Sequence, residues 1–339
     1  MSVTLQNITF QNIIGHSRVI EQLERMTARK SVPHALVFTG PEAVGKRTTA
    51  LAFATSLLAP PPKAGENVAS QAEKVRLLAS GNHPDYHVCS RAEEKKDISV
   101  EAVRELCASI RLKPYYGTAR VSVIDNAHEL SLAASNALLM TLEEPCADSY
   151  LILVTHAPQR LPATILSRCQ MITFGELTGN EASQVLSRIP GIDQKQHAEA
   201  LKLCTGTLEA LELGRFVNPI NLRFENEKAI SGHLTDLTER AARLRKDIDA
   251  YISQCLEQTV RAASAVSLAS QLAAEADDST LVWRIFHRAL RDALRAAPRS
   301  DISRMANLLE LSLTAEKLVR ERNVNPQLQL TSLLLEELR

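Results

Sequence analysis

Continuous runs of apolar residues mark the first half of the chain. Three of them are Ala35–Thr39, Val121–Asp125, which ends in an acid, and Tyr150–Thr155. Runs of this length without polar alternation are typical of strands buried on both faces of a parallel sheet. The stretches Lys46–Leu58 and Ser131–Glu144 lie between these runs and have helical spacing. Strands that alternate with helices predict an α/β domain with a parallel sheet.

Beyond Phe174 the strand pattern nearly disappears, and helical spacing continues to the C-terminus. The segment Leu281–Ala296 predicts a helix with one apolar face. Its opposite face carries four arginines: Arg284, Arg288, Arg291 and Arg295. They could contact phosphate, although such charges are more often simply solvated. Gly, Asn and Pro cluster at Gly214–Pro219, so we expect one domain boundary there and another near residue 174. Asn325-Pro326 predicts a helix start, with Asn as the N-cap.

Composition favours a protein of two or three domains without a global charge. The chain has 339 residues, and Lys plus Arg and Asp plus Glu both total 39, so no net field attracts it to DNA or a membrane. An aromatic content of 4% argues against a base-stacking surface for single strands. No apolar stretch is long enough to span a bilayer, and the first ten residues lack a signal-peptide pattern. We therefore expect a cytoplasmic protein with no membrane partner.

Three patterns that can indicate metal or acid–base chemistry are better explained by structure. The six cysteines include no CxxC pair, which argues against a tetrathiolate zinc site and a disulfide framework. His83-Pro84-Asp85-Tyr86-His87 has too few ligands for a metal and fits a loop that enters a strand. Glu143 and Glu144 are adjacent, so on a helix their side chains point about 100° apart. No metal site is predicted.

The strongest local motif is a glycine loop between a predicted strand and a predicted helix. The segment Gly40–Lys46 has the glycine and lysine spacing of a phosphate-binding loop, in which backbone N–H groups and the helix N-terminus bind phosphate. The next residue is Arg47, where the motif has a Ser or Thr that holds Mg²⁺. Thr48 comes one residue late, about 100° further round the helix. A structural turn that only keeps this spacing is the alternative.

The run that ends at Asp125 resembles the strand that supplies a metal-side aspartate in nucleotide-hydrolysing proteins. The next residue is Asn126, which cannot act as a general base, and the spacing of Glu129 does not place it in that role. An ordinary buried strand that ends in an acid is the alternative. Together with Arg47, this predicts that the chain does not hydrolyse ATP. Five residues would form the degenerate nucleotide site: Gly40, Gly45, Lys46, Thr48 and Asp125.

Arg168 lies in Ser167-Arg168-Cys169, after the strand that ends at Thr155. A lone arginine is usually a solvated charge or a carboxylate partner. At this position, however, it could act on the ATP of an adjacent subunit, where a trans-acting arginine stabilises transition-state charge.

Several segments together resemble the delta-prime subunits of the bacterial DNA polymerase III clamp loader. The similar segments occur in the family's order: Phe10–His16, Pro33–Pro41, Gly81–Asp85, Asn136–Pro145, Leu161–Gln170 and Asn323–Leu328. The fourth and fifth are the most specific to clamp-loader subunits. The resemblance implies a RecA-like AAA+ domain, a small helical lid and an all-α collar. We assign them to residues 1–174, 175–215 and 216–339.

The resemblance also implies partners and a role for Arg168. The partners would be gamma/tau and delta subunits and, through the assembly, the sliding clamp and primed DNA. Arg168 would reach the ATP of a neighbouring gamma/tau subunit. Three departures from relatives matter: Leu57–Ser80 lacks the cysteines of a zinc module, Met140 replaces a lysine, and Thr205–Ala210 lacks a sensor arginine. No zinc is therefore expected, and the sequence does not indicate what effect Met140 has.

We therefore predict a non-hydrolysing clamp-loader subunit that needs no cofactor, with weak ATP or ADP binding left open. The first alternative is an active gamma/tau-like ATPase. The second is a pure scaffold, in which Arg168 forms only a local salt bridge.

Overall fold

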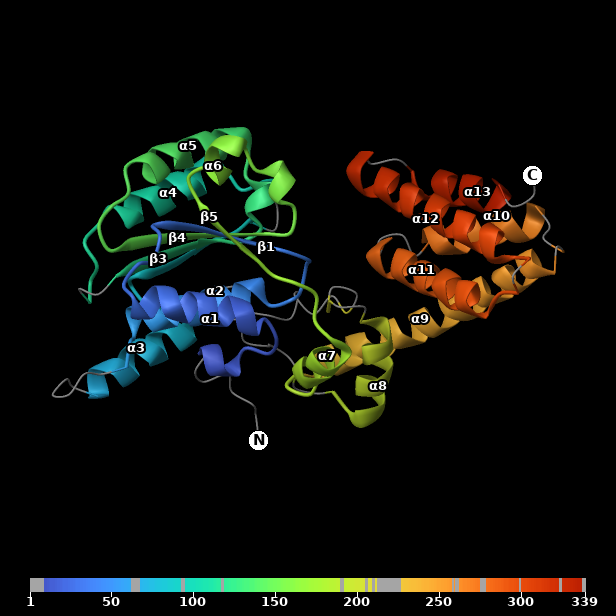
Figure 1. Cartoon of the computed structure of the whole chain (residues 1–339), viewed down its shortest axis with the longest axis horizontal. Coiled ribbons are helices and arrows are strands. Elements are labelled where there is room, and N and C mark those ends of the chain that lie inside the picture. Colours follow the sequence, from blue (N-terminus) through green and yellow to red (C-terminus); the bar gives the residue numbers. More distant parts are fainter. Residues whose placement is uncertain are drawn as a thin grey trace. The chain divides into compact units, whose positions relative to one another are not determined.

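The computed structural model describes residues 9–61, 68–92, 95–116, 119–189, 192–204, 207–208, 211, 227–257, 259, 262–274, 279–298, 300–322 and 325–336. The chain divides into two compact units. The first comprises Met1–Ile192 and Cys204–Glu227, and the second comprises Asp193–Leu203 and Lys228–Arg339. Figure 1 shows a sheet between helices in the first unit and helices alone in the second.

The first unit is built on a parallel sheet of five strands in the order β2-β3-β4-β1-β5. The strands are β1 (Ala35–Thr39), β2 (Tyr86–Cys89), β3 (Arg120–Ile124), β4 (Ser149–Thr155) and β5 (Gln170–Thr173). The three predicted apolar strands are confirmed as β1, β3 and β4. Strand β2 begins where the loop at His83–His87 was expected to enter a strand, and β5 is additional. Because β1 pairs with both β4 and β5, the loop that follows it lies between the ends of these two strands at the sheet's carboxyl-terminal edge.

Helices cover both faces of this sheet (Figure 1). One face carries α1 (Ser17–Ala28), α2 (Lys46–Leu58) and α3 (Val68–Ser80), and the other carries α4 (Val100–Ile110), α5 (Leu132–Glu143) and α6 (Ala163–Leu166). Within β1, Leu36 and Phe38 belong to the first core and Ala35 and Val37 to the second. Burial on both faces explains the continuous apolar runs. The expected α/β domain with a parallel sheet is confirmed.

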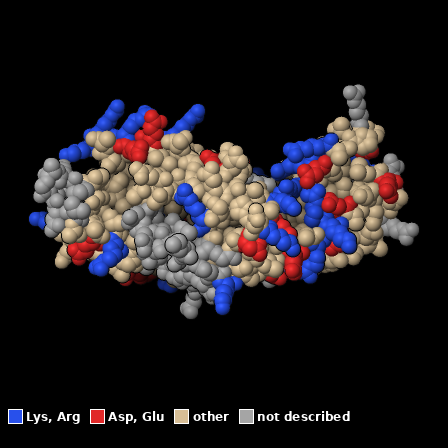
Figure 2. Space-filling model, turned by 90° about the horizontal axis from the view of Figure 1, so that it is seen from below, with Lys and Arg blue, Asp and Glu red and all other residues tan. Residues whose placement is uncertain are grey.

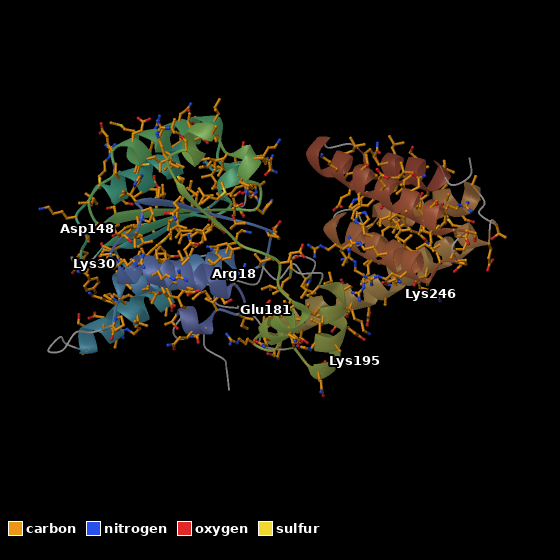
Figure 3. The ribbon with its side chains drawn as sticks, in the orientation of Figure 1. Arg18, Lys30, Asp148, Glu181, Lys195 and Lys246 are labelled. Carbon is orange, nitrogen blue, oxygen red and sulfur yellow. The ribbon has the colours of Figure 1, made fainter. Side chains whose placement is uncertain are left out.

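Short polar motifs set the helix starts. The Ser131 hydroxyl accepts from the Ala134 backbone N–H at 3.2 Å, so the predicted helix begins at Leu132 with Ser131 as its N-cap. Thr178 and Glu181 form a capping box at α7 (Gly179–Leu186), where Figure 3 labels Glu181. Three one-turn 3₁₀ helices complete the first unit: η1 (Phe10–Asn12), η2 (Ala127–Glu129) and η3 (Pro158–Arg160).

The second unit is helical throughout its described residues. Its helices are α8 (Gln194–Leu203), α9 (Glu227–Leu256), α10 (Ala262–Ala274), α11 (Ser279–Ala296), α12 (Ile302–Arg322) and α13 (Pro326–Glu336). The predicted helix start at Asn325 is confirmed, since its Oδ1 accepts from the Gln327 N–H at 2.9 Å. The apolar face of α11 is buried as predicted, and Trp283, His287 and Leu290 widen it.

The division into a lid and a collar stays a prediction, because the boundary expected at Gly214–Pro219 lies outside the described residues. On the face shown in Figure 2, Lys and Arg are interspersed with Asp and Glu on each unit. Among the helices that the structure describes, none has the length and apolarity needed to cross a membrane. The described side chains contain no group of three or more His, Cys, Asp or Glu that could hold a metal ion.

Candidate functional site

The glycine loop connects β1 to α2 and requires glycine at both predicted positions. Gly40 has φ +138°, and a Cβ there would lie 2.4 Å from the Phe174 carbonyl oxygen. Gly45 has φ +100°, a conformation that strains any L side chain, and it directly precedes α2. Its carbonyl accepts from the Thr49 N–H and hydroxyl, at 2.9 and 3.0 Å. The loop therefore keeps the backbone form of a phosphate-binding turn.

The lysine of the glycine loop, Lys46, hydrogen-bonds to backbone carbonyls of the same loop. The Lys46 Nζ donates to the Gly40 carbonyl oxygen at 2.8 Å and also to that of Pro41. Its side chain is buried, so these carbonyls replace the water that an ammonium would otherwise need. Two of the three N–H donors of the ammonium are therefore used on carbonyls of the loop itself.

Arg47 occupies the metal side of the site. Its Nη1 donates to Asp125 Oδ2 at 2.7 Å, with side-chain exposures of 22% for Arg47 and 12% for Asp125. The structure thus joins two residues that the sequence identified separately, 78 positions apart. The Arg47 Nη2 is buried without a hydrogen-bond partner. Thr48 lies partly buried in the first turn of α2, and no hydrogen bond to the other site residues is described for its side chain.

The turn after Asp125 offers no unpaired carboxylate. Asn126 has φ +50° and caps the start of η2. The Glu129 Oε2 accepts from the Arg91 Nε at 3.0 Å, so its charge is already matched. Neither Asn126 nor the ion-paired Glu129 therefore offers a free carboxylate at this turn.

Two histidines and a threonine lie at the ends of β3 and β4, and sequence reasoning did not identify them. The His128 Nδ1 is 3.2 Å from the Thr155 hydroxyl, and the rings of His128 and His156 are 4.0 Å apart. Burial, together with the smaller effects of the charges of His156, Arg160 and Lys46, lowers the pKa of His128 to about 4. His128 is therefore neutral near pH 7. The only signal was the position of Thr155 at the end of an apolar strand.

Two other segments of the first unit contact the glycine loop. The His16 Nε2 donates to the Val44 carbonyl at 2.7 Å, and the His16 ring packs edge-on against Phe174 at 5.0 Å. The Leu208 N–H points to the Ala43 carbonyl at 3.4 Å. In the segment expected to lack a sensor arginine, Thr205, Gly206, Glu209 and Ala210 lie outside the described residues.

Arg168 lies in the turn between α6 and β5 and is bound to neighbouring groups. Its Nη1 donates to the Thr164 carbonyl at 3.0 Å and to the Ser167 hydroxyl at 3.3 Å. Its Nη2 pairs with Glu143 Oε1 at 2.9 Å, across to the end of α5. The Arg168 side chain is 37% exposed and that of Glu143 is 52% exposed. Sequence reasoning placed Glu143 at a helix end but missed this partner.

The glycine loop and Arg168 lie at opposite edges of the sheet. Gln170, at the start of β5, pairs with Leu36 near the start of β1, whereas the glycine loop follows the end of β1. Figure 3 labels Lys30 and Asp148, which precede β1 and β4 and mark the edge where strands begin. A five-residue strand spans about 16 Å, which exceeds the reach of an arginine side chain. Arg168 therefore cannot serve the glycine loop of its own chain.

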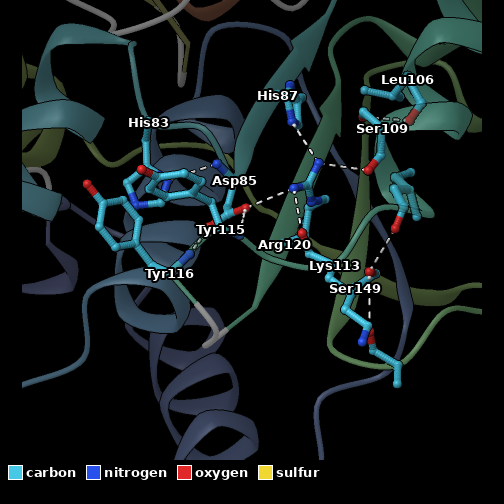
Figure 4. A network of polar contacts seen from close by, with 12 residues as sticks. His83, Asp85, His87, Leu106, Ser109, Lys113, Tyr115, Tyr116, Arg120 and Ser149 are labelled. Atoms are coloured by element: carbon cyan, nitrogen blue, oxygen red, sulfur yellow. Dashed lines mark hydrogen bonds and ion pairs between the residues drawn. The ribbon is translucent and has the colours of Figure 1, made fainter.

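A buried polar network at the starts of β2 and β3 holds the loop that follows α4 (Figure 4). The Asp85 carboxylate accepts from the N–H groups of Tyr115 and Tyr116 at 2.7 and 3.0 Å, and from Arg120 Nη2 at 3.0 Å. The His83 Nδ1 accepts from the Asp85 N–H at 3.1 Å. The prediction of a loop that enters a strand is confirmed, because β2 begins at Tyr86 directly after this loop.

Comparison with known proteins finds similarity to subunits of DNA polymerase III. The family described as "DNA polymerase III, delta subunit" matches residues 15–178. DNA polymerase III subunit delta' of Pseudomonas aeruginosa is 37% identical over 145 residues, 43% of this chain and 44% of that protein. The Escherichia coli subunit delta' is 33% identical over 174 residues, 51% and 52% of the two chains. The Haemophilus influenzae subunit tau/gamma is 34% identical over 187 residues, which are 53% of this chain and 26% of that protein. The matched stretches span about half or less of these relatives.

Proposed function

We propose that the chain is a clamp-loader subunit of the delta' kind without ATPase activity of its own. The match of residues 15–178 to the family described as "DNA polymerase III, delta subunit", and the similarity to DNA polymerase III delta' subunits, support this proposal. In this role it supplies Arg168 to the ATP site of a neighbouring gamma/tau subunit. Its partners are the gamma/tau and delta subunits and, through the assembly, the sliding clamp and primed DNA.

The ion pair between Arg47 and Asp125 is the observation that carries the absence of hydrolysis. A guanidinium has five N–H donors and no lone pair for a metal, so Arg47 cannot replace the hydroxyl ligand of Mg²⁺. It also neutralises the carboxylate that would approach the metal. With Asn126 in place of a base, the site lacks both the metal and the residue that activates water.

The position of Arg168 supports action in trans. The side chain is partly exposed at the sheet edge opposite its own glycine loop, so only a phosphate from another chain can reach it. A trans-acting arginine can raise turnover by roughly 10³–10⁵ because it stabilises charge on the transferred phosphoryl group.

A scaffold without a catalytic arginine is a second candidate, and the ion pair between Arg168 and Glu143 is the observation that favours it. Similarity to tau/gamma subunits favours a third, an active ATPase, but Arg47 and Asn126 oppose it. We propose further that the protein requires neither nucleotide nor zinc, and that any ATP or ADP at the glycine loop binds weakly.

The test is the ATPase activity of a complex reconstituted with gamma/tau and delta subunits of the same organism. Rates are measured with and without clamp and primed DNA, for wild type and Arg168→Ala. Arg29→Ala is the matched control, because Arg29 is exposed at the end of α1 and no side-chain contact is described for it. The lone chain is assayed in parallel.

We expect a silent lone chain and at least a tenfold loss of stimulated turnover in Arg168→Ala, with Arg29→Ala unchanged. Assembly of each variant is confirmed by size-exclusion chromatography. Full activity of an assembled Arg168→Ala complex would reduce the chain to a scaffold. Turnover by the lone chain would instead support an active ATPase.

A further inference from the structure

Glu143 occupies a position that helix stability does not explain. It is the last residue of α5, where the helix dipole is negative and a cation rather than an anion is favoured. Its side chain is exposed, so burial does not require it either. The described contact that compensates this charge is the Arg168 guanidinium at 2.9 Å. A residue that breaks a local rule in this way is a candidate for a functional role.

The described contacts of Arg168 use three of the five N–H donors of its guanidinium. Nη1 uses both of its N–H groups, on the Thr164 carbonyl and the Ser167 hydroxyl, and Nη2 uses one on Glu143. The contacts with Thr164 and Ser167 hold the guanidinium against the turn that carries Arg168, and because both acceptors are neutral they leave its charge uncompensated. The contact with Glu143 differs, because a carboxylate neutralises the charge that a trans-acting arginine must deliver.

We propose that Glu143 restrains Arg168 and must release it before the arginine can act on a neighbour's nucleotide. This inference rests on the proposed function of Arg168. The Glu143 carboxylate and the phosphate of the neighbouring ATP compete for one guanidinium, and they cannot both approach it without repelling each other. Glu143 is thus a positioning residue that lowers ATP turnover until assembly on the clamp and DNA brings the phosphate to Arg168.

The strength of the pair suits a restraint that can be released. Two partly exposed side chains in water interact weakly, and such a pair shifts an equilibrium by no more than about fivefold. A phosphate carries more charge than a carboxylate and accepts bidentate contacts from arginine, so it displaces Glu143 once it is in reach. Removing the carboxylate should therefore raise basal turnover by about two- to fivefold and stimulated turnover by less.

The chain offers a matched control one residue away. Glu144 is exposed, follows directly after α5, and has no described contact with Arg168. Glu143→Gln and Glu144→Gln make the same change of charge and size at neighbouring sites. They are compared in the reconstituted complex with Arg168→Ala and with the double variant Glu143→Gln/Arg168→Ala. ATPase is measured without and with clamp and primed DNA, and kcat and KM are determined separately.

We expect basal kcat to rise in Glu143→Gln relative to Glu144→Gln, and the rise to vanish in the Arg168→Ala background. That non-additivity is the signature of a residue acting through Arg168. Equal rates for the two glutamine variants, or a lower kcat for Glu143→Gln, would overturn the restraint while leaving the finger intact. If Arg168→Ala alone retains full turnover, the proposed function itself fails.

Discussion

Asp85 is the residue whose neutralisation should destabilise the first unit most clearly. Its carboxylate is fully buried and accepts from Arg120 and from the N–H groups of Tyr115 and Tyr116 (Figure 4). Asp85→Asn keeps the shape but removes the charge and turns an NH₂ group toward N–H donors. Leaving a buried ion pair without one partner costs about 3–5 kcal/mol. For a unit of this size that is a fall in Tm of about 6–20 °C.

The assay can separate the two units, because Trp283 is the only tryptophan and lies in α11 of the second unit. Thermal unfolding is followed by hydrogen exchange of β3 amides for the first unit and by Trp283 fluorescence for the second. Asp97→Asn makes the same chemical change at an exposed position and should stay within about 0.5 kcal/mol of wild type. A first-unit shift no larger than that of Asp97→Asn would refute the energetic importance of the buried pair.

Two further predictions concern the nucleotide site and acid stability. Binding of ATP or ADP to the lone chain should be weak and insensitive to Mg²⁺, whereas Arg47→Thr should introduce Mg²⁺ dependence because it frees Asp125. Nucleotide titrations in Mg²⁺ or in EDTA test this. Tight, Mg²⁺-dependent binding by the wild-type chain would contradict it. Burial lowers the pKa of His83 from 6.5 to about 4, so on acidification His83 is protonated in the unfolded chain before it is protonated in the folded chain. The free energy of unfolding should therefore fall as the pH drops from 7 to 5, by about 2 kcal/mol for each such histidine. His83→Asn should flatten the pH dependence of the urea midpoint, and an unchanged slope would count against this assignment.

The parts of the fold that the sequence predicted are those with strong periodicity. Helix α2 matches the predicted range, and β1, β3 and β4 are apolar because both of their faces are buried. The edge strands carried no comparable signal. Strand β5 has four residues, of which only Ile172 is buried, and β2 is equally short, with Tyr86 and Cys89 buried at its ends. Edge strands of this length bury too few side chains to leave a pattern.

Local motifs identified the individual site residues, whereas their partners depend on tertiary structure. The glycine loop, Asp125 and Arg168 each follow an element whose pattern is visible in the chain. Nothing local links Arg47 to Asp125 or Glu143 to Arg168, because the sheet order and the length of α5 bring these pairs together. Their spacing in sequence therefore could not predict which charges are neutralised.

The parallel sheet also explains how the two roles that we propose for this domain can be independent of each other. All strands end at the edge that carries the glycine loop and begin at the edge that carries Arg168, so the two share no described side-chain contact. Distant sites of this kind contribute to free energies nearly independently. A substitution of Arg47 at one edge should therefore leave the contacts of Arg168 at the other edge unchanged. Glu143 lies at the same edge as Arg168, so under the proposed function we expect the activity of Arg168 to respond to substitution of Glu143 and not to the state of the glycine loop.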